Sequence, residues 1–173
     1  MHTEIIEEPK DLSLYKTISI ITFDEPDENL IKETLYQMMD TAIDHIIVIS
    51  DNPKTIEYSD RYGADTISDD VEKNVFKLVR DVLFEVEGKS NKFYDYIFFI
   101  DVRTPMDYKS MIKKVSSFTT DVVVSMNKGD IGFHVGPPIM AFRRELFTQL
   151  KNPTGNIEDI MKLNMSIGAL INY

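Results

Sequence analysis

The chain of 173 residues is 43% hydrophobic with a formal net charge of −10, which is typical of one globular domain with a sizeable core and argues against a nucleic-acid partner. Because cysteine is absent, neither disulfides nor thiolate metal sites form. No apolar run approaches membrane-spanning length and the first residues are acidic and polar, so we expect a cytoplasmic protein without a signal peptide or membrane span.

Short β-rich runs alternate with helical patterns over the first 126 residues. "HIIVIS" is a continuous apolar run, as in a strand, whereas "ENLIKETLYQMMDTA" carries apolar residues at helical spacing. Asn52-Pro53 and Gly63 mark the start and end of one helix, and Val71 would lie on the buried face of the next. Predicted strands are residues 17–22, 45–50, 64–67, 94–100 and 121–126, and predicted helices are residues 28–42, 52–63, 69–86 and 106–118.

This alternation predicts an α/β fold with a mostly parallel sheet, because strands separated by helices form right-handed βαβ crossovers. The strand runs lack apolar–polar alternation, so helices are expected on both faces, in a three-layer sandwich. The C-terminal third is less regular. Residues 127–138 hold three glycines and two prolines and are predicted to form a loop. A strand (139–142), a short helix (143–150), a turn (151–155), a helix (156–168) and a last strand (169–173) are expected after it.

Carboxylates follow three of the predicted strands. Asp24 and Glu25 follow the first strand, Asp51 follows the second, and Asp101 follows "YIFFI". Ligands of open parallel sheets bind outside the carboxyl ends of the strands. Such carboxylates suit Mg²⁺ or Mn²⁺ and thus a phosphate-bearing substrate, although aspartate also favours turns and helix caps. Neither GxxxxGK[ST] nor GxGxxG occurs, and the loop after the first strand has no glycine, which argues against P-loop and Rossmann phosphate binding.

Six stretches in order resemble family 2 glycosyltransferases of the GT-A fold. In "SIITFDEPDENLIKETL", the residues Thr22, Phe23, Asp24 and Glu25 stand where the family has T-Y-N-E. The remaining five stretches are "IIVISDNP", with Asp51 at an aspartate that commonly contacts the base, "YGADTI", "YIFFIDVR", with Asp101 at the first aspartate of D-x-D, "GPPIMAFRRELF", with Arg143 and Arg144, and "NIEDIMKLNMSIGALINY", with Glu158 and Asp159 at an E-D pair.

The resemblance spans residues 17–173 and implies transfer of a sugar from a nucleotide-diphosphate sugar to a hydroxyl acceptor, with inversion. It implies one GT-A-like domain over residues 1–173, made of an N-terminal extension (1–16), a nucleotide-binding half (17–126) and an acceptor half (127–173). Asp101 would bind a Mg²⁺ or Mn²⁺ cofactor, and Asp159 would be the general base. Arg143, Arg144 and His134 would lie near the acceptor, although a surface histidine and a solvated helix start account for them as well. The chain is short for the family, so the acceptor site would be either minimal or completed by a partner subunit or a homo-oligomer.

Arg103 departs from the family, because it occupies the second aspartate position of D-x-D. Side chains two residues apart in an extended chain point to the same side, so we expect Arg103 to pair with Asp101 in the empty site. Three interpretations are open. Arg103 binds the diphosphate directly, or Asp101 binds the metal together with Asp24 or Asp51. In the third, catalysis has been lost and the chain is a GT-A-like binding module. A cytidylyltransferase-like enzyme is the remaining alternative.

Overall fold

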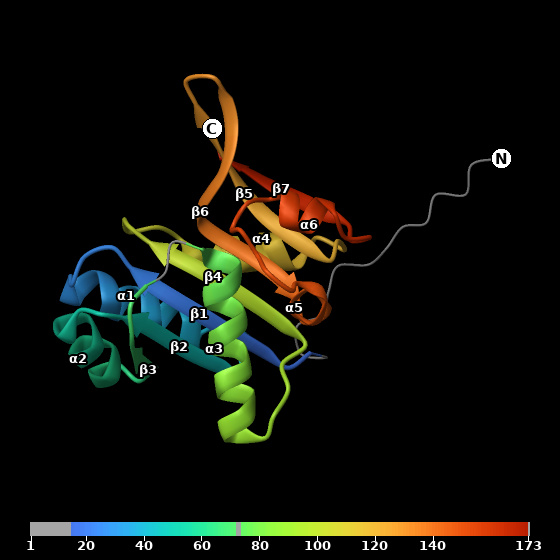
Figure 1. Cartoon of the computed structure of the whole chain (residues 1–173). Helices are drawn as coiled ribbons and strands as arrows, with labels where there is room; N and C mark the ends of the chain where they lie inside the picture. The colour runs from blue at the N-terminus through green and yellow to red at the C-terminus, as the bar shows by residue number, and fades with distance from the viewer. Residues whose placement is uncertain (1–14, 72–73, 173) are drawn as a thin grey trace.

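The computed structural model describes residues 15–71 and 74–172; of the expected N-terminal extension, residues 1–14 lie outside this range. Seven strands of the described chain form one sheet in the order β3-β2-β1-β4-β6-β5-β7 (Figure 1). The strands are β1 (Thr17–Phe23), β2 (His45–Ser50), β3 (Asp65–Ser68), β4 (Tyr96–Val102), β5 (Val122–Gly129), β6 (Gly132–Arg143) and β7 (Ile167–Asn172).

The first four strands run parallel, as βαβ crossovers require. β6 is antiparallel to both β4 and β5, and β7 is parallel to β5. The sheet is therefore mixed but mostly parallel, and the predicted α/β class is confirmed. Because β1, β2 and β4 point the same way, their carboxyl ends meet at one edge of the sheet.

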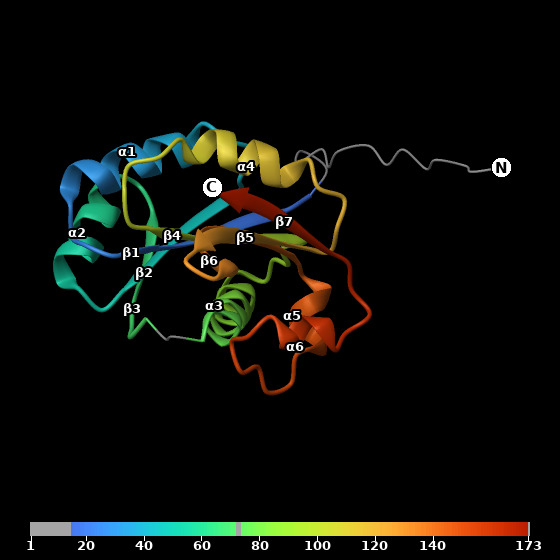
Figure 2. The same ribbon diagram turned by 90° about the horizontal axis from the view of Figure 1, so that it is seen from above.

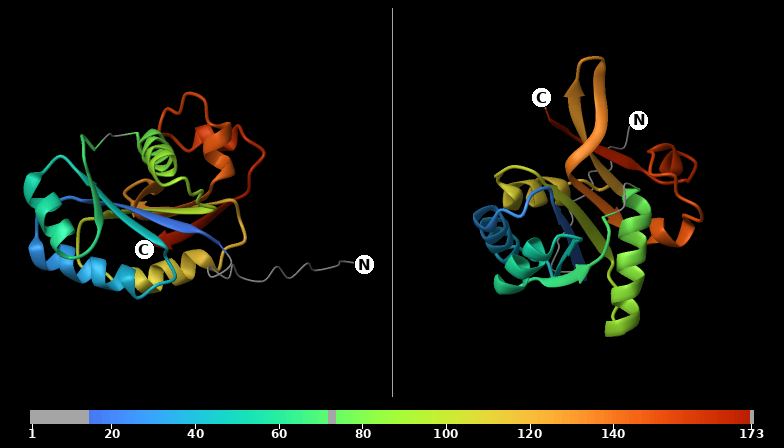
Figure 3. Two further views of the ribbon diagram at one scale, coloured as in Figure 1. Left: turned by 90° about the horizontal axis from the view of Figure 1, so that it is seen from below. Right: turned by 60° about the vertical axis from the view of Figure 1, so that its left-hand side comes forward.

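Helices cover both faces of the sheet (Figures 2 and 3). α1 (Glu28–Met39) and α4 (Tyr108–Ser116) lie on one face, with α2 (Pro53–Arg61) packed against α1. α3 (Val75–Ser90) covers the other face, together with the short helices α5 (Glu145–Gln149) and α6 (Glu158–Met161). No helix of the described chain is long and apolar enough to cross a membrane.

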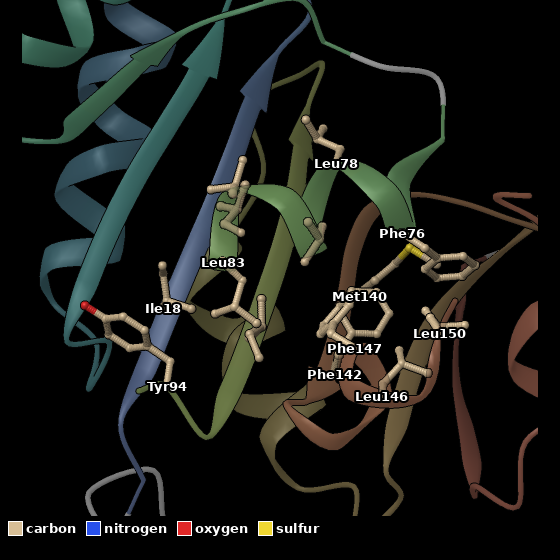
Figure 4. Packing of buried hydrophobic residues seen from close by; sticks show 14 of the residues in the cluster. Ile18, Phe76, Leu78, Leu83, Tyr94, Met140, Phe142, Leu146, Phe147 and Leu150 are labelled. Carbon is tan, nitrogen blue, oxygen red and sulfur yellow. The ribbon is translucent and has the colours of Figure 1, made fainter. Parts of the chain in front are cut away.

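The core divides into two layers because strand side chains alternate between the faces. In β4, Ile97 and Phe99 pack on the α3 side, whereas Phe98 and Ile100 pack on the side of α1 and α4. The α3 side is filled by large apolar residues of α3, β6 and α5 (Figure 4). By the same alternation Asp101 lies on the α3 side, next to the position of Phe99.

Side-chain caps define where the helices begin. The Asn52 side chain accepts a hydrogen bond from the Lys54 N–H, and Gly63 has a φ of 94°, so the predicted limits of α2 are confirmed. Asn74 caps α3 in the same way, through the N–H of Lys77. This cap starts α3 at Val75, so the prediction that the helix begins near residue 69 and buries Val71 is wrong, and Val71 is exposed.

The predicted loop at residues 127–138 is a β-hairpin instead. β5 continues to Gly129 and β6 begins at Gly132, so the glycines form the turn of a hairpin that extends beyond the sheet (Figures 1 and 3). Proline lacks an N–H and therefore interrupts strand pairing. The pairing of β5 with β6 continues past this interruption because its register shifts between Val123 and Ser125. The predicted helix at residues 156–168 is also wrong, because α6 spans only Glu158–Met161.

Candidate functional site

A cavity of about 830 Å³ lies at the carboxyl ends of β1, β2 and β4, on the α3 side of the sheet. Its floor comes from these strand ends, and its walls come from the start of α3, the middle of β6 and the turn before α6. The lining residues are Thr22, Phe23, Asp24, Pro26, Ser50, Asp51, Asn52, Thr55, Val71, Val75, Phe76, Phe99, Asp101, Arg103, Val135, Gly136, Pro137, Pro138, Ile139, Met140, Gly155, Asn156, Ile157 and Glu158.

Thr22 and Asp101 lie side by side at the floor of this cavity. They are register partners at the ends of the parallel strands β1 and β4. Thr22 is almost fully buried, and its hydroxyl donates a hydrogen bond of 3.2 Å to Oδ1 of Asp101. Strand pairing and this bond together fix the orientation of the Asp101 carboxylate.

Arg103 contacts the other oxygen of the same carboxylate. Its Nε and Nη2 groups each donate to Asp101 Oδ2 at 3.2 Å. The expectation that these two side chains pair is confirmed. The Arg103 side chain is 59% exposed and that of Asp101 is 23% exposed, so water reaches the cation more than the anion.

A second cavity, of about 490 Å³, shares Asp101 and Arg103 with the first. It extends toward the start of α4 and the end of β7. Tyr108 lines it and donates its hydroxyl to the Thr104 carbonyl at 2.7 Å. Burial raises the pKa of Tyr108 to about 12, and the Asp101 carboxylate adds to the increase, so the phenol stays neutral. The ion pair therefore lies at the junction of two cavities.

The charges of the first cavity are mostly negative. Its described lining holds the carboxylates of Asp24, Asp51, Asp101 and Glu158, with Arg103 as the cation. Within residues 15–71 and 74–172, no three His, Cys, Asp or Glu side chains are close enough to hold a metal ion. Asp101 Oδ2 already accepts two guanidinium N–H groups, and a guanidinium repels a divalent cation. The donor set therefore does not fit a divalent metal held by the protein alone.

Glu158 and Asp159, the expected catalytic pair, point to different places. Glu158 lines the cavity, whereas Asp159 accepts hydrogen bonds from the Thr154 N–H, the Thr154 hydroxyl and the Gly155 N–H at 2.8–2.9 Å. Asp159 thus holds the turn at residues 154–155. Gly155 has a φ of 91°, and a Cβ there would lie 3.2 Å from Asn74 side-chain atoms, so the turn packs closely on the cap of α3.

The three acceptor candidates lie away from the residues that line the cavity. Arg143 pairs in register with Tyr96, at the opposite end of β4 from Asp101 and roughly 16 Å away by strand rise. Arg144 follows it and binds Glu87. His134 lies exposed on the projecting hairpin, opposite Asn127. In the described chain, the cavity lining does not include Arg143, Arg144, His134 or the predicted nucleotide-binding residue Glu25.

Sequence reasoning missed several residues that complete the cavity. Ser50, Asn52 and Thr55 come from the end of β2 and the start of α2, next to the predicted Asp51. Of the wall formed by residues 135–140, residues 135–138 fall in the stretch that is predicted to be a loop. Only the pairing of Ile100 with Ile139 brings this wall to the end of β4. No local sequence signal identifies such a long-range pairing.

Comparisons with known proteins identify solved structures that share the fold of this chain. No family model and no curated protein matches the sequence. Among solved structures, Mycobacterium tuberculosis glucosyl-3-phosphoglycerate synthase matches with a TM-score of 0.62 and 16% identity, over 92% of this chain and 72% of that chain. The fold is that of the nucleotide-diphospho-sugar transferases. A structure of that synthase with Mg²⁺ and uridine diphosphate matches with a TM-score of 0.58 and 15% identity, over 92% of this chain and 70% of that chain.

CMP:2-keto-3-deoxy-manno-octonic acid synthetase in complex with CTP is similar as well. It matches with a TM-score of 0.56 and 12% identity, over 91% of this chain and 90% of that chain. At these identities the likeness shows the fold alone. The fold implied by the resemblance of the sequence to GT-A glycosyltransferases is thus confirmed.

Proposed function

We propose that the protein binds a nucleoside diphosphate sugar in the larger cavity and transfers the sugar to a hydroxyl acceptor. The observation that supports this most directly is the meeting of Thr22, Asp51 and the Asp101–Arg103 pair at the carboxyl ends of adjacent parallel strands. Ligands of open α/β sheets bind at such edges. Solved proteins of the same fold contain uridine diphosphate or CTP.

The two ends of the cavity suit the two ends of such a donor. The end of β2 offers the exposed carboxylate of Asp51 and the side chain of Asn52, which suit hydrogen bonds to the base or ribose. The end of β4 offers Arg103, whose guanidinium suits the diphosphate. Thr22, Phe23 and Asp24 lie between the two ends, along the end of β1 and the residue after it.

Sugar transfer needs a base for the acceptor hydroxyl. In this proposal the acceptor oxygen bonds to the anomeric carbon, the bond from that carbon to the diphosphate breaks, and the hydroxyl proton passes to a carboxylate. Glu158 is the better candidate of the E-D pair because it is exposed to the cavity. Asp159 takes a positioning role, since its oxygens hold the turn whose Gly155 lines the same cavity. The smaller cavity beyond Arg103 offers room for the acceptor.

Nucleotidyl transfer is the second candidate. It is favoured by size, because the chain spans 90% of the CTP-bound synthetase but 72% of the glucosyl-3-phosphoglycerate synthase. The segment that follows β1, "DEPDE", holds neither glycine nor a basic residue to bind a triphosphate. This difference favours sugar transfer over nucleotidyl transfer.

Product analysis separates these reactions. The protein is incubated with UDP- and GDP-linked sugars and a panel of hydroxyl acceptors, and separately with CTP and sugar phosphates. We expect release of nucleoside diphosphate in the first set, lowered at least 100-fold in Glu158→Gln but unchanged in Glu33→Gln, a control on the exposed surface of α1. Release of pyrophosphate from CTP would instead indicate nucleotidyl transfer. Nucleotide binding without turnover in either set would indicate a binding module.

A further inference from the structure

The connection between Thr22, Asp101 and Arg103 has a defined direction. The Thr22 hydroxyl donates to one carboxylate oxygen of Asp101, and two N–H groups of Arg103 donate to the other. Each oxygen of Asp101 therefore accepts from a different side chain. This arrangement fixes the carboxylate and lets it fix the guanidinium in turn.

The guanidinium keeps donors available after this pairing. Arginine carries five N–H donors in a planar fork. Asp101 accepts from the single N–H of Nε and from one N–H of Nη2. Within the described chain, Nη1 of Arg103 has no hydrogen-bond partner. The outer edge formed by Nη1 and Nη2 is the edge that binds phosphate oxygens in a bidentate manner. An anion can therefore bind Arg103 without displacing Asp101.

The charges around Arg103 favour its binding of an anionic ligand. Four carboxylates line the larger cavity in the described chain, and Arg103 is the cation among them. A diphosphate carries at least two negative charges and needs a positive partner to enter. The donor set does not form a cage for a divalent cation, whereas the guanidinium is already present and oriented.

We propose that Arg103 binds the diphosphate of the nucleotide directly, and that Asp101 is a positioning residue for Arg103 rather than a metal ligand. The ligand class is a diphosphate, free or within a nucleoside diphosphate, and the nucleotide part of this inference rests on the proposed function. Binding then needs no added divalent cation. Thr22 contributes by orienting Asp101.

Calorimetric titration tests the inference. Inorganic pyrophosphate and uridine diphosphate are titrated into the full chain in EDTA and then in MgCl₂. We expect binding in EDTA within about threefold of that in MgCl₂. Arg103→Ala should weaken pyrophosphate binding about 10- to 100-fold, the range for hydrogen bonds to a charged group. Arg103→Lys should not restore it, because an ammonium lacks the fork. Arg61→Ala is the control, since Arg61 also pairs with carboxylates but lies outside the cavity.

Asp101→Asn distinguishes a positioning residue from a metal ligand. In EDTA we expect this variant to bind pyrophosphate about three- to tenfold more weakly than the unmodified chain, because Arg103 loses its charged partner. In the Arg103→Ala background the same change should have no further effect, because the two residues act as one unit. Circular dichroism checks that each variant is folded.

Two results would overturn the inference. One is tighter pyrophosphate binding by Asp101→Asn in EDTA, as expected if the carboxylate only repels the anion. The other is strict dependence on Mg²⁺ with Arg103→Ala unchanged; if sugar transfer then still occurred, the proposed function would stand without this inference. Pyrophosphate binding through Arg103 without turnover of any donor would have the opposite meaning, supporting the anion site and contradicting sugar transfer.

Discussion

Two arginine–carboxylate pairs lie at opposite ends of β4 and differ in burial and in how many carboxylate oxygens the arginine contacts. At the carboxyl end, Arg103 contacts one oxygen of Asp101 at 3.2 Å and is 59% exposed. At the other end, Arg144 contacts both oxygens of Glu87 at 2.9 Å, and the Glu87 side chain is 4% exposed. The same chemistry thus occurs once with an exposed arginine and once against a buried carboxylate.

The surroundings of Arg144 complete a structural site. Glu87 also accepts the N–H of Tyr94, and the guanidinium carbon of Arg144 lies 5.1 Å from the ring centroid of Phe93. The hydrogen bond to Glu87 raises the pKa of Arg144 further above its usual value. Both arginines donate from Nε and Nη2, but the guanidinium of Arg144 binds a buried carboxylate and packs near the rings of Phe84 and Phe93, whereas that of Arg103 is exposed and borders a cavity. The comparison teaches that partners and burial, not residue type, separate a structural arginine from one available to a ligand.

The largest expected effect is on stability, at the buried pair. Arg144→Ala leaves a buried carboxylate whose remaining donor is the N–H of Tyr94, and breaking such a pair costs about 3 kcal/mol, the low end of the known range because Arg144 is partly exposed. Urea unfolding measures the loss. Replacing both partners, with Glu87→Leu added, should recover part of it, because no buried charge is then left alone. A loss below about 1 kcal/mol in Arg144→Ala would mean that water replaces the guanidinium.

The parallel half of the fold could be predicted because its signals are local. Each strand is an apolar run, and the helices between them carry their own caps, such as Asn52 before Pro53. Three parallel strands then necessarily deliver the residues after them to one edge, so Asp51 and Asp101 could be expected to line one cavity. The pairing of Asp101 with Arg103 follows from the period of two in an extended chain.

The rest could not be predicted, because it depends on contacts between distant residues. The hairpin wall at residues 135–140 exists only because β6 pairs with both β4 and β5. Arg144 resembled a ligand-binding residue in a family motif, and its partner Glu87 is 57 positions away in the sequence. Asp159 has the sequence position of a base, but its oxygens accept from a turn that no pattern identifies.

The exposed pair should contribute little to stability. Arg103→Ala removes an ion pair that water already solvates, so the free energy of unfolding should change by less than about 1 kcal/mol. The same urea unfolding experiment used for Arg144 measures it. A loss above about 2 kcal/mol would place Arg103 among the structural arginines and remove the contrast on which its ligand role depends.

The smallest expected effect sharpens the comparison at a third, exposed pair, Arg61–Glu28. Glu28 Oε1 accepts from the Tyr62 hydroxyl at 2.8 Å and from Arg61 at 2.7 Å, and these bonds, the one from Tyr62 first, hold its pKa below the ordinary value of 4.5. Because the pKa is lowered in the folded state, the ionised carboxylate stabilises the fold at pH values above the pKa of the unfolded chain, and this contribution disappears as the pH falls through the pKa of the folded chain.

Tyr62→Phe keeps the ring but removes the hydrogen bond that lowers the pKa of Glu28 most. The pKa of Glu28 should therefore rise toward 4.5 in a carboxyl-carbon NMR titration, while Tyr36→Phe, a neighbouring ring without this bond, should leave it unchanged. The stability difference between Tyr62→Phe and the unmodified chain should be visible near neutral pH and should vanish in acid. A Glu28 pKa that is the same in all three proteins would show that solvent screens even a short hydrogen bond at this surface, as it does for weaker ion pairs.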